Sequence, residues 1–132
     1  MSRENVELIR SCYEAVARGD LEAALAVSHP DVEIRGTGRL PDVVQVRGHE
    51  AVRSFFEELF SAFQEVQLVP ERYIDAGEVV IVAVRQVMRG RGSGVELVNR
   101  VVVAWHVRDG KVIRGDSYAD EREALEAVGL SE

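Results

Sequence analysis

The side chains that most often ligate metals or attack substrates, histidine and cysteine, are few and scattered in this sequence. The histidines stand at positions 29, 49 and 106, and Cys12 is the only cysteine. Metal sites usually bring such residues close together along the chain, for example as two histidines four positions apart. No such spacing occurs here, so we expect no metal site, and a single cysteine excludes an intrachain disulfide.

A glycine-rich stretch at positions 90–94, Gly-Arg-Gly-Ser-Gly, superficially resembles a phosphate-binding loop. Phosphate loops lead into a helix whose N-terminus holds the anion. This stretch instead joins two segments rich in β-branched residues, which is typical of a flexible hairpin. We therefore expect no nucleotide or other cofactor.

More promising polar residues lie in the segment 95–107, whose alternating pattern predicts a strand. Val101, Val103 and Trp105 share one parity and should face inward, where the indole N–H can donate a hydrogen bond to a ligand or the ring can simply pack. His106 has the opposite parity, together with Arg100, Ala104 and, from the next segment, Arg114 and Asp116. This row offers an acid–base pair, but a solvated or dimer-facing sheet surface explains it better.

Helices in the first half of the chain would have to position these residues. Apolar side chains recur every three to four residues up to Gly19, and Asp20 can then cap a second helix that ends at His29-Pro30. The strongest helical pattern begins at His49 and consists of Val52, Phe55, Phe56, Leu59, Phe60 and Phe63.

Strand patterns dominate the second half. A short alternating segment at 32–35 precedes a loop with two glycines and a proline, and four longer segments follow at 66–74, 79–89, 95–107 and 111–118. Short connections between the four predict successive antiparallel strands. Asp120 with Glu123 predicts the cap of a closing helix. The order implies an α+β fold with helices on one face of the sheet.

Length and charge narrow the classes of function. The 132 residues, 46% of them hydrophobic, suit a single domain over 1–132 that needs no metal or disulfide support. Sixteen basic against 23 acidic residues give a formal charge of -7, which disfavours nucleic acid and anionic membranes as partners. No apolar run approaches about 20 residues, and the first residues lack the apolar core of a signal peptide, so we expect a cytoplasmic protein.

Five segments, in this order, resemble the NTF2-like superfamily, in particular its SnoaL-like branch, which is related to polyketide cyclases and ketosteroid isomerases. They are residues 13–20, 29–34, 48–52, 109–112 and 118–125. The resemblance covers nearly the whole chain. It implies a cystatin-like cone, in which a curved, mainly antiparallel sheet wraps around helices and encloses an internal pocket, commonly as a homodimer through the sheet.

The resemblance also carries the family's catalytic positions onto this chain. In its isomerases, a carboxylate base and two acidic donors would fall on Ile34, Cys12 and Val103, and none of these can move a proton or stabilise an enolate. Tyr13 lies one residue from a donor position, but one helical residue turns a side chain by about 100°. A steroid isomerase is therefore disfavoured.

The family's water-activating hydrolases use polar residues on the first strand and a carboxylate on the last. These positions correspond to Ile34, Gly36 and Ser117, which lack the required acid and base. Asp116 neighbours Ser117, yet strand alternation sends it to the opposite face.

We therefore expect a binder of a small, apolar, lipophilic metabolite, of undetermined activity. Its pocket should be lined by Tyr13, Val16, Ile34, Phe56, Val103, Trp105 and Ser117, with no metal. One alternative is an acid–base enzyme, a cyclase, isomerase, hydrolase or dehydratase, acting on a polyketide- or terpenoid-like compound through Tyr13 or Ser117. Another is a dimeric interaction module without a ligand.

Overall fold

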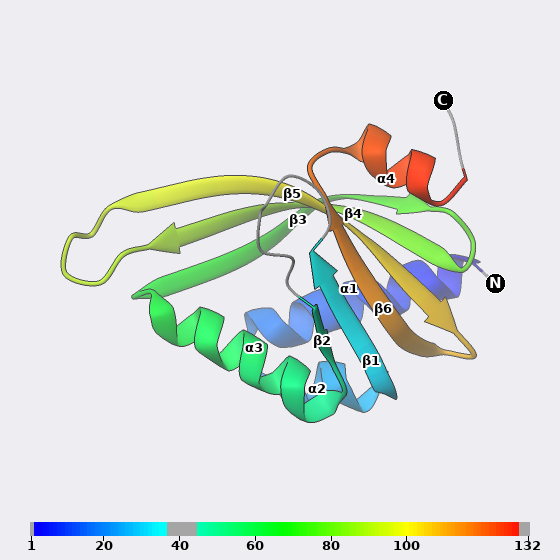
Figure 1. The fold of residues 1–132 in the computed structure, drawn as a ribbon, viewed down its shortest axis with the longest axis horizontal. Helices are drawn as coiled ribbons and strands as arrows, with labels where there is room; N and C mark the ends of the chain where they lie inside the picture. The colour runs from blue at the N-terminus through cyan, green and yellow to red at the C-terminus, as the bar shows by residue number, and fades with distance from the viewer. Residues whose placement is uncertain (1, 37–44, 130–132) are drawn as a thin grey trace.

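The computed structural model describes residues 2–36 and 45–129 (Figure 1). Within these ranges the chain forms four helices, α1 (Ser2–Ala17), α2 (Leu21–Ala26), α3 (His49–Ala62) and α4 (Glu121–Ala127). The strands are β1 (Ser28–Gly36), β2 (Gln45–Arg47), β3 (Glu65–Asp75), β4 (Val79–Arg89), β5 (Glu96–Arg108) and β6 (Lys111–Tyr118). The predicted α+β class is confirmed.

Local sequence signals set most helix ends. Gly19 takes a φ of 82° just after α1, a left-handed conformation that glycine adopts at little cost. The predicted caps are confirmed, because the carboxylate of Asp20 accepts a hydrogen bond from the backbone N–H of Ala23 at 3.1 Å, and that of Asp120 accepts one from Glu123 at 2.9 Å.

The prediction that His29-Pro30 ends the second helix is wrong. α2 stops at Ala26, and both residues belong to β1. Ser28 already pairs with Val112 of β6, and the register between β1 and β6 then shifts before Glu33. A proline fits such an irregular stretch, because its missing N–H interrupts no ladder there.

The strands form one curved sheet in the order β2-β1-β6-β5-β4-β3. The predicted antiparallel run β3-β4-β5-β6 is confirmed, and β4 and β6 have the predicted bounds. β1 joins β6 in parallel, and β2 joins β1 in antiparallel fashion. The sequence did not reveal β2, since three residues are too few to show alternation.

Helices cover both faces of the sheet, which corrects the expectation that they pack on one. α1, α2 and α3 lie against the concave inner face, whereas α4 lies on the opposite, outer face (Figure 1). Ala124 and Leu125 of α4 pack on Ile81, Val102 and Ala104. The central strands carry apolar residues of both parities, so they require cover on both sides.

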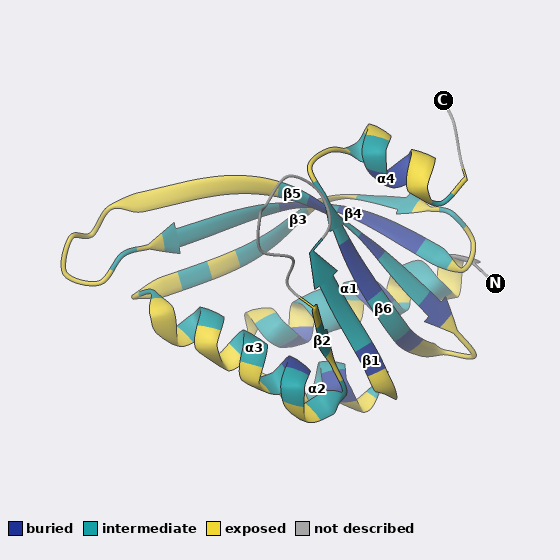
Figure 2. Cartoon of the chain, viewed as in Figure 1, coloured by how far each residue is buried: buried dark blue, intermediate teal, exposed yellow. Residues whose placement is uncertain are grey.

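The ends of β4 and β5 extend beyond the helices as a long hairpin (Figures 1 and 2). Residues 91–100 are all exposed, including Val95, Leu97 and Val98 with more than half of their surface accessible. No helix among the described residues is long and apolar enough to cross a membrane.

Candidate functional site

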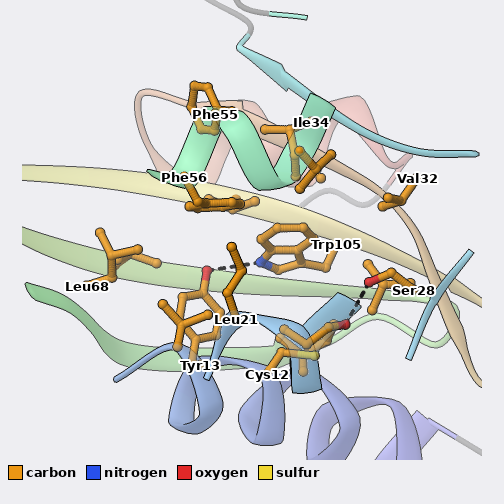
Figure 3. A pocket seen from close by; sticks show the side chains of 18 of the residues that line it. Cys12, Tyr13, Leu21, Ser28, Val32, Ile34, Phe55, Phe56, Leu68 and Trp105 are labelled. Atoms are coloured by element: carbon orange, nitrogen blue, oxygen red, sulfur yellow. Dashed lines mark hydrogen bonds between the residues drawn. The ribbon is translucent and has the colours of Figure 1, made fainter. Parts of the chain in front are cut away.

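A cavity of about 180 Å³ lies between the inner face of the sheet and helices α1, α2 and α3, and it is partly open to solvent. All seven residues that the sequence placed around a pocket lie on its wall, together with other side chains. Figure 3 labels four of the seven, Tyr13, Ile34, Phe56 and Trp105. The wall is formed by Ile9, Cys12, Tyr13, Val16, Leu21, Ala24, Leu25, Ser28, Val32, Ile34, Val52, Phe55, Phe56, Leu59, Leu68, Val84, Gln86, Val101, Val103, Trp105, Val112, Gly115 and Ser117.

Periodicity explains why these side chains converge. On α1 the lining residues are spaced three to four apart, as are those of α3, so each helix turns a single apolar stripe inward. On β5 the lining residues are Val101, Val103 and Trp105, which alternate along the strand. These three segments supply 11 of the 23 wall residues, and each shows its periodic pattern in the sequence.

Tyr13 and Trp105 form a hydrogen-bonded pair in this wall. The indole Nε1 of Trp105 donates to the hydroxyl oxygen of Tyr13 at 3.0 Å, and the rings meet edge to face with centroids 6.3 Å apart (Figure 3). The hydroxyl keeps its own proton, for which the described residues offer no acceptor. Burial raises the pKa of Tyr13 above its ordinary value, so the group is a neutral donor at physiological pH.

Gly115 makes room for the indole. It pairs with Trp105 across β5 and β6, and a Cβ atom added at Gly115 would overlap Cζ3 of the ring. No side chain larger than hydrogen fits there without moving the tryptophan. The absence of a side chain at Gly115 therefore lets the indole occupy the place from which its N–H reaches Tyr13.

Three further polar groups lie in the wall. Ser28 donates its hydroxyl to the carbonyl of Ala24 at 2.9 Å, and Ser117 also faces the cavity. Gln86, which the sequence analysis did not single out, accepts a hydrogen bond from Asn99 at 3.0 Å. Its parity on β4, shared with the inward-facing Val84, was the signal that would have placed it here.

The described side chains of the wall carry no net charge near pH 7. None of the described residues that line it carries a carboxylate, an imidazole, an ammonium or a guanidinium group. The two titratable groups are Tyr13 and Cys12, and burial raises the pKa of Cys12 to about 11. The cavity can bind an apolar body and offer a hydrogen bond, but its described side chains hold no group that removes a proton near pH 7.

The charged row on the other parity forms a network on the outer face. Asp116 accepts two hydrogen bonds from Arg35, at 2.7 and 3.0 Å, and one from Arg114 at 3.0 Å. Its side chain is only 2% exposed, so the expectation of a solvated row is wrong for Asp116. Burial favours the neutral acid, but the hydrogen bonds and charges of Arg35 and Arg114 outweigh it and hold the pKa of Asp116 well below its usual range.

His106 belongs to the same network. Nη2 of Arg114 lies 3.1 Å from Nε2 of His106, and because a guanidinium group only donates, Nε2 must be the acceptor. Oδ2 of Asp116 lies 3.6 Å from the same nitrogen. His106 and Asp116 are thus neighbours, as an acid–base pair would be, but on the face opposite the cavity.

The other two histidines, His29 and His49, contact backbone groups, and neither lines the cavity. Nε2 of His49 lies 3.0 Å from the carbonyl oxygen of Ser28, and Nδ1 of His29 accepts a hydrogen bond from the backbone of Asp31 at 2.9 Å. Within residues 2–36 and 45–129, no group of three or more histidine, cysteine or acidic residues is arranged to hold a metal ion.

A protein-family model described as a SnoaL-like domain matches residues 9–115. No curated protein matches the chain significantly. Among solved structures, an NTF2-like protein from Burkholderia xenovorans LB400 is 30% identical, with a TM-score of 0.75 over 91% of this chain and 92% of that one. TerC, co-crystallised with polyporic acid, is 25% identical, with a TM-score of 0.75 over 93% and 96% of the two chains.

A protein with a cystatin-like fold from Xanthomonas campestris shares the fold at 17% identity, with a TM-score of 0.74 over 96% of this chain and 98% of that one. These structures confirm the predicted NTF2-like, cystatin-like architecture. They do not show which molecule the cavity binds or whether it catalyses a reaction, so these must be argued from the residues of this chain.

Proposed function

The chain belongs to the family of SnoaL-like domains, and from this premise we propose that it binds a small, mainly apolar organic molecule in the cavity, held by a hydrogen bond from the hydroxyl of Tyr13. The supporting observation is the Tyr13–Trp105 pair, which leaves the hydroxyl proton of Tyr13 to donate within a mostly apolar wall.

The size of the cavity limits the part of the ligand that it encloses. A dry protein cavity of about 150 Å³ binds benzene. At about 180 Å³, this cavity has room for one ring or a short branched chain, and its open side allows the rest of a larger molecule to protrude. The crystallisation of TerC with polyporic acid supports a small organic ligand for this fold.

The Tyr13–Trp105 pair determines the polarity of the ligand. Trp105 donates to the oxygen of Tyr13, and a hydroxyl that accepts one hydrogen bond becomes a better donor in the next. The ligand should therefore present an acceptor, such as a ketone or ester carbonyl, toward Tyr13. A donor-only group would leave the hydroxyl proton unpaired inside the cavity, which is costly.

Acetophenone and ethylbenzene test this proposal, because they have nearly the same shape and differ in one carbonyl. Trp105 is the only tryptophan, so its fluorescence reports on the cavity wall directly. We expect acetophenone to bind about five- to tenfold more tightly, as one hydrogen bond of about 1 kcal/mol implies. Tyr13→Phe should remove this preference and leave ethylbenzene binding unchanged.

Tyr73→Phe is the matched control, because Tyr73 lies on β3 outside the cavity wall, with its ring 4.6 Å from the guanidinium of Arg10. That variant should keep the preference. The proposal is wrong if the wild type binds neither compound, or if the preference for acetophenone survives in Tyr13→Phe.

The same ligand separates binding from acid–base catalysis. An enzyme that removes a proton next to a carbonyl would exchange the methyl protons of acetophenone for deuterium in D₂O, and NMR detects this exchange. Because the described wall holds no base, we expect no exchange above the buffer rate. Catalysed exchange would instead favour an enzyme of the cyclase or isomerase type.

Dimerisation through the sheet is a separate part of the proposal. It is supported by the exposed apolar residues of the β4–β5 hairpin, among them Val95, Leu97 and Val98. Sedimentation equilibrium should show a dimer at micromolar concentration. A monomer over that range would remove this part and leave ligand binding unaffected.

A further inference from the structure

Gln86 is an exception in the cavity wall. It lies on the inner face of β4, where Leu68 of β3 and Asn99 of β5 are its partners in register. The neighbouring inner position on the same strand is Val84, which is buried. An apolar side chain at position 86 would pack equally well against its neighbours. The presence of an amide there therefore suggests a role in binding.

The orientation of the amide is determined by its neighbour. Nδ2 of Asn99 donates to Oε1 of Gln86 at 3.0 Å, which turns Nε2 of Gln86 away from that contact. The amide nitrogen carries two protons, and no acceptor for them lies among the described residues. Gln86 is thus half-buried, its amide is held in place by Asn99, and its N–H groups remain available to donate to a ligand.

Gln86 and Tyr13 lie toward opposite ends of the cavity. Tyr13 bonds to Trp105, and Gln86 bonds to Asn99, which precedes Trp105 by six residues on β5. At a rise of about 3.4 Å per residue, the backbone positions of Asn99 and Trp105 are about 20 Å apart. The inner-face positions between them are Val101 and Val103, so the intervening wall is apolar.

The end near Gln86 is the open one. Along the inner face of β5, Trp105, Val103 and Val101 are half-buried, Asn99 is exposed, and Leu97 is 52% exposed. A ligand seated against Tyr13 would therefore leave the enclosed volume past Gln86.

We infer that Gln86 is a second polar anchor, and that the ligand is an elongated molecule with a hydrogen-bond acceptor at each end of an apolar spacer. The inner acceptor meets the hydroxyl of Tyr13, and the outer acceptor meets Nε2 of Gln86. This inference rests on the proposed function and specifies its substrate class.

Methyl esters of ω-benzoylalkanoic acids, with about eight to fourteen methylene groups between the carbonyls, are suitable probes, because their extended chains approach the separation of about 20 Å between the two anchors. Each is compared with the alkyl phenyl ketone of equal length, which lacks the outer acceptor. We expect the ester to bind more tightly than its ketone, by about fivefold at one chain length and less at shorter and longer ones. The fluorescence of Trp105 measures both.

Gln86→Leu should abolish the advantage of the ester and retain binding of the plain ketone. Tyr13→Phe should do the reverse, weakening ketone and ester alike while their ratio persists. Gln67→Leu is the matched control, because Gln67 lies on β3 outside the cavity wall and bonds to Glu65. Circular dichroism melting establishes that each variant is folded.

The outcomes are distinguishable. If the ketones bind but no ester gains affinity at any length, or if the gain survives Gln86→Leu, this inference is wrong and the proposed function stands. If no ketone binds at all, both are wrong.

Discussion

The two faces of the sheet treat polar groups in opposite ways. On the outer face, the carboxylate of Asp116 is 2% exposed and bonded to two arginines, with a histidine beside it. On the inner face, the hydroxyl proton of a tyrosine and the amide protons of a glutamine have no acceptor among the described residues, and the surrounding wall is mostly apolar. The outer groups satisfy one another, whereas the inner groups are left available.

This difference distinguishes polar groups that stabilise the fold, such as Asp116, from polar groups that can bind a ligand, such as Tyr13 and Gln86. Buried polar groups in folded proteins nearly always have partners, because an unpaired one costs free energy. A charged cluster with perturbed pKa values is often an active site, but here it ties β1 to β6 and lies on the face away from the cavity. The unpaired neutral donors are the better guide to where this protein meets another molecule.

The largest effect should come from breaking the outer network. Asp116→Ala leaves Arg35 and Arg114 about one-third exposed and without their carboxylate. We expect a loss of about 3 kcal/mol in the free energy of unfolding, measured with urea. Arg100→Ala, on the same face but in an exposed pair with Glu71, should cost less than about 1 kcal/mol. Equal losses would contradict a special role for Asp116.

The same network gives a signed pH dependence. Because the pKa of Asp116 is held below its usual range, the folded protein binds fewer protons in acid than the unfolded chain does. Its contribution to stability is present above about pH 4 and decreases as the pH falls below that value. Asp116→Asn should flatten this part of the stability curve.

Enlarging the side chains of two adjacent residues, Val103 on the inner face and Ala104 on the outer face, tests the difference between the two faces. Ala104 is fully buried under α4, so Ala104→Leu should cost about 2 kcal/mol through overpacking. Val103 faces the cavity, so Val103→Phe has space and should change the free energy of unfolding by less than about 1 kcal/mol. The phenylalanine should also weaken acetophenone binding at least tenfold. Similar costs at both sites would mean that the cavity is not a real void.

A smaller effect is expected from Gly115→Ala. The new methyl group would displace the indole of Trp105 and break its bond to Tyr13, at a cost of about 1–2 kcal/mol. The emission of Trp105 should shift, and the preference for acetophenone over ethylbenzene should fall. Unchanged emission and binding would show that Gly115 does not position the ring.

The smallest effect concerns the thiol in the wall. A pKa of about 11 at Cys12 lowers the thiolate fraction near pH 8 about a hundredfold relative to a free cysteine. Alkylation by iodoacetamide should therefore be slow, and bound acetophenone should slow it further. Because Cys12 is the only cysteine, mass spectrometry gives its rate directly. Rapid alkylation unaffected by ligand would place the thiol outside the cavity.

Alternation and helical period predict the α+β class, the antiparallel run β3-β4-β5-β6 and the inward parity of several residues that line the cavity. Trp105, Val103 and Ile34 face inward as their parity requires, and Tyr13 and Val16 lie on the inward stripe of α1. These assignments depend on single elements, whose patterns the sequence displays.

The missed features depend on contacts between distant segments. Asp116 is buried because Arg35, 81 residues away, joins it through the parallel pairing of β1 and β6, and no local pattern encodes that pairing. Likewise, α4 has an apolar stripe, but the stripe does not say which face of the sheet it covers. Gln86 was overlooked because a polar residue inside an apolar strand reads as a surface position.

The parallel pairing of β1 with β6 also affects how the protein is made. β1 is synthesised early, yet its partner β6, at residues 111–118, is the last of the described strands to be made. Until then, the apolar stripes of α1 and α3 have only part of the sheet to cover. The nascent chain therefore completes its hollow interior only after β6 has been synthesised, and a chain that stops before β6 would lack both Gly115 and Ser117 from the wall.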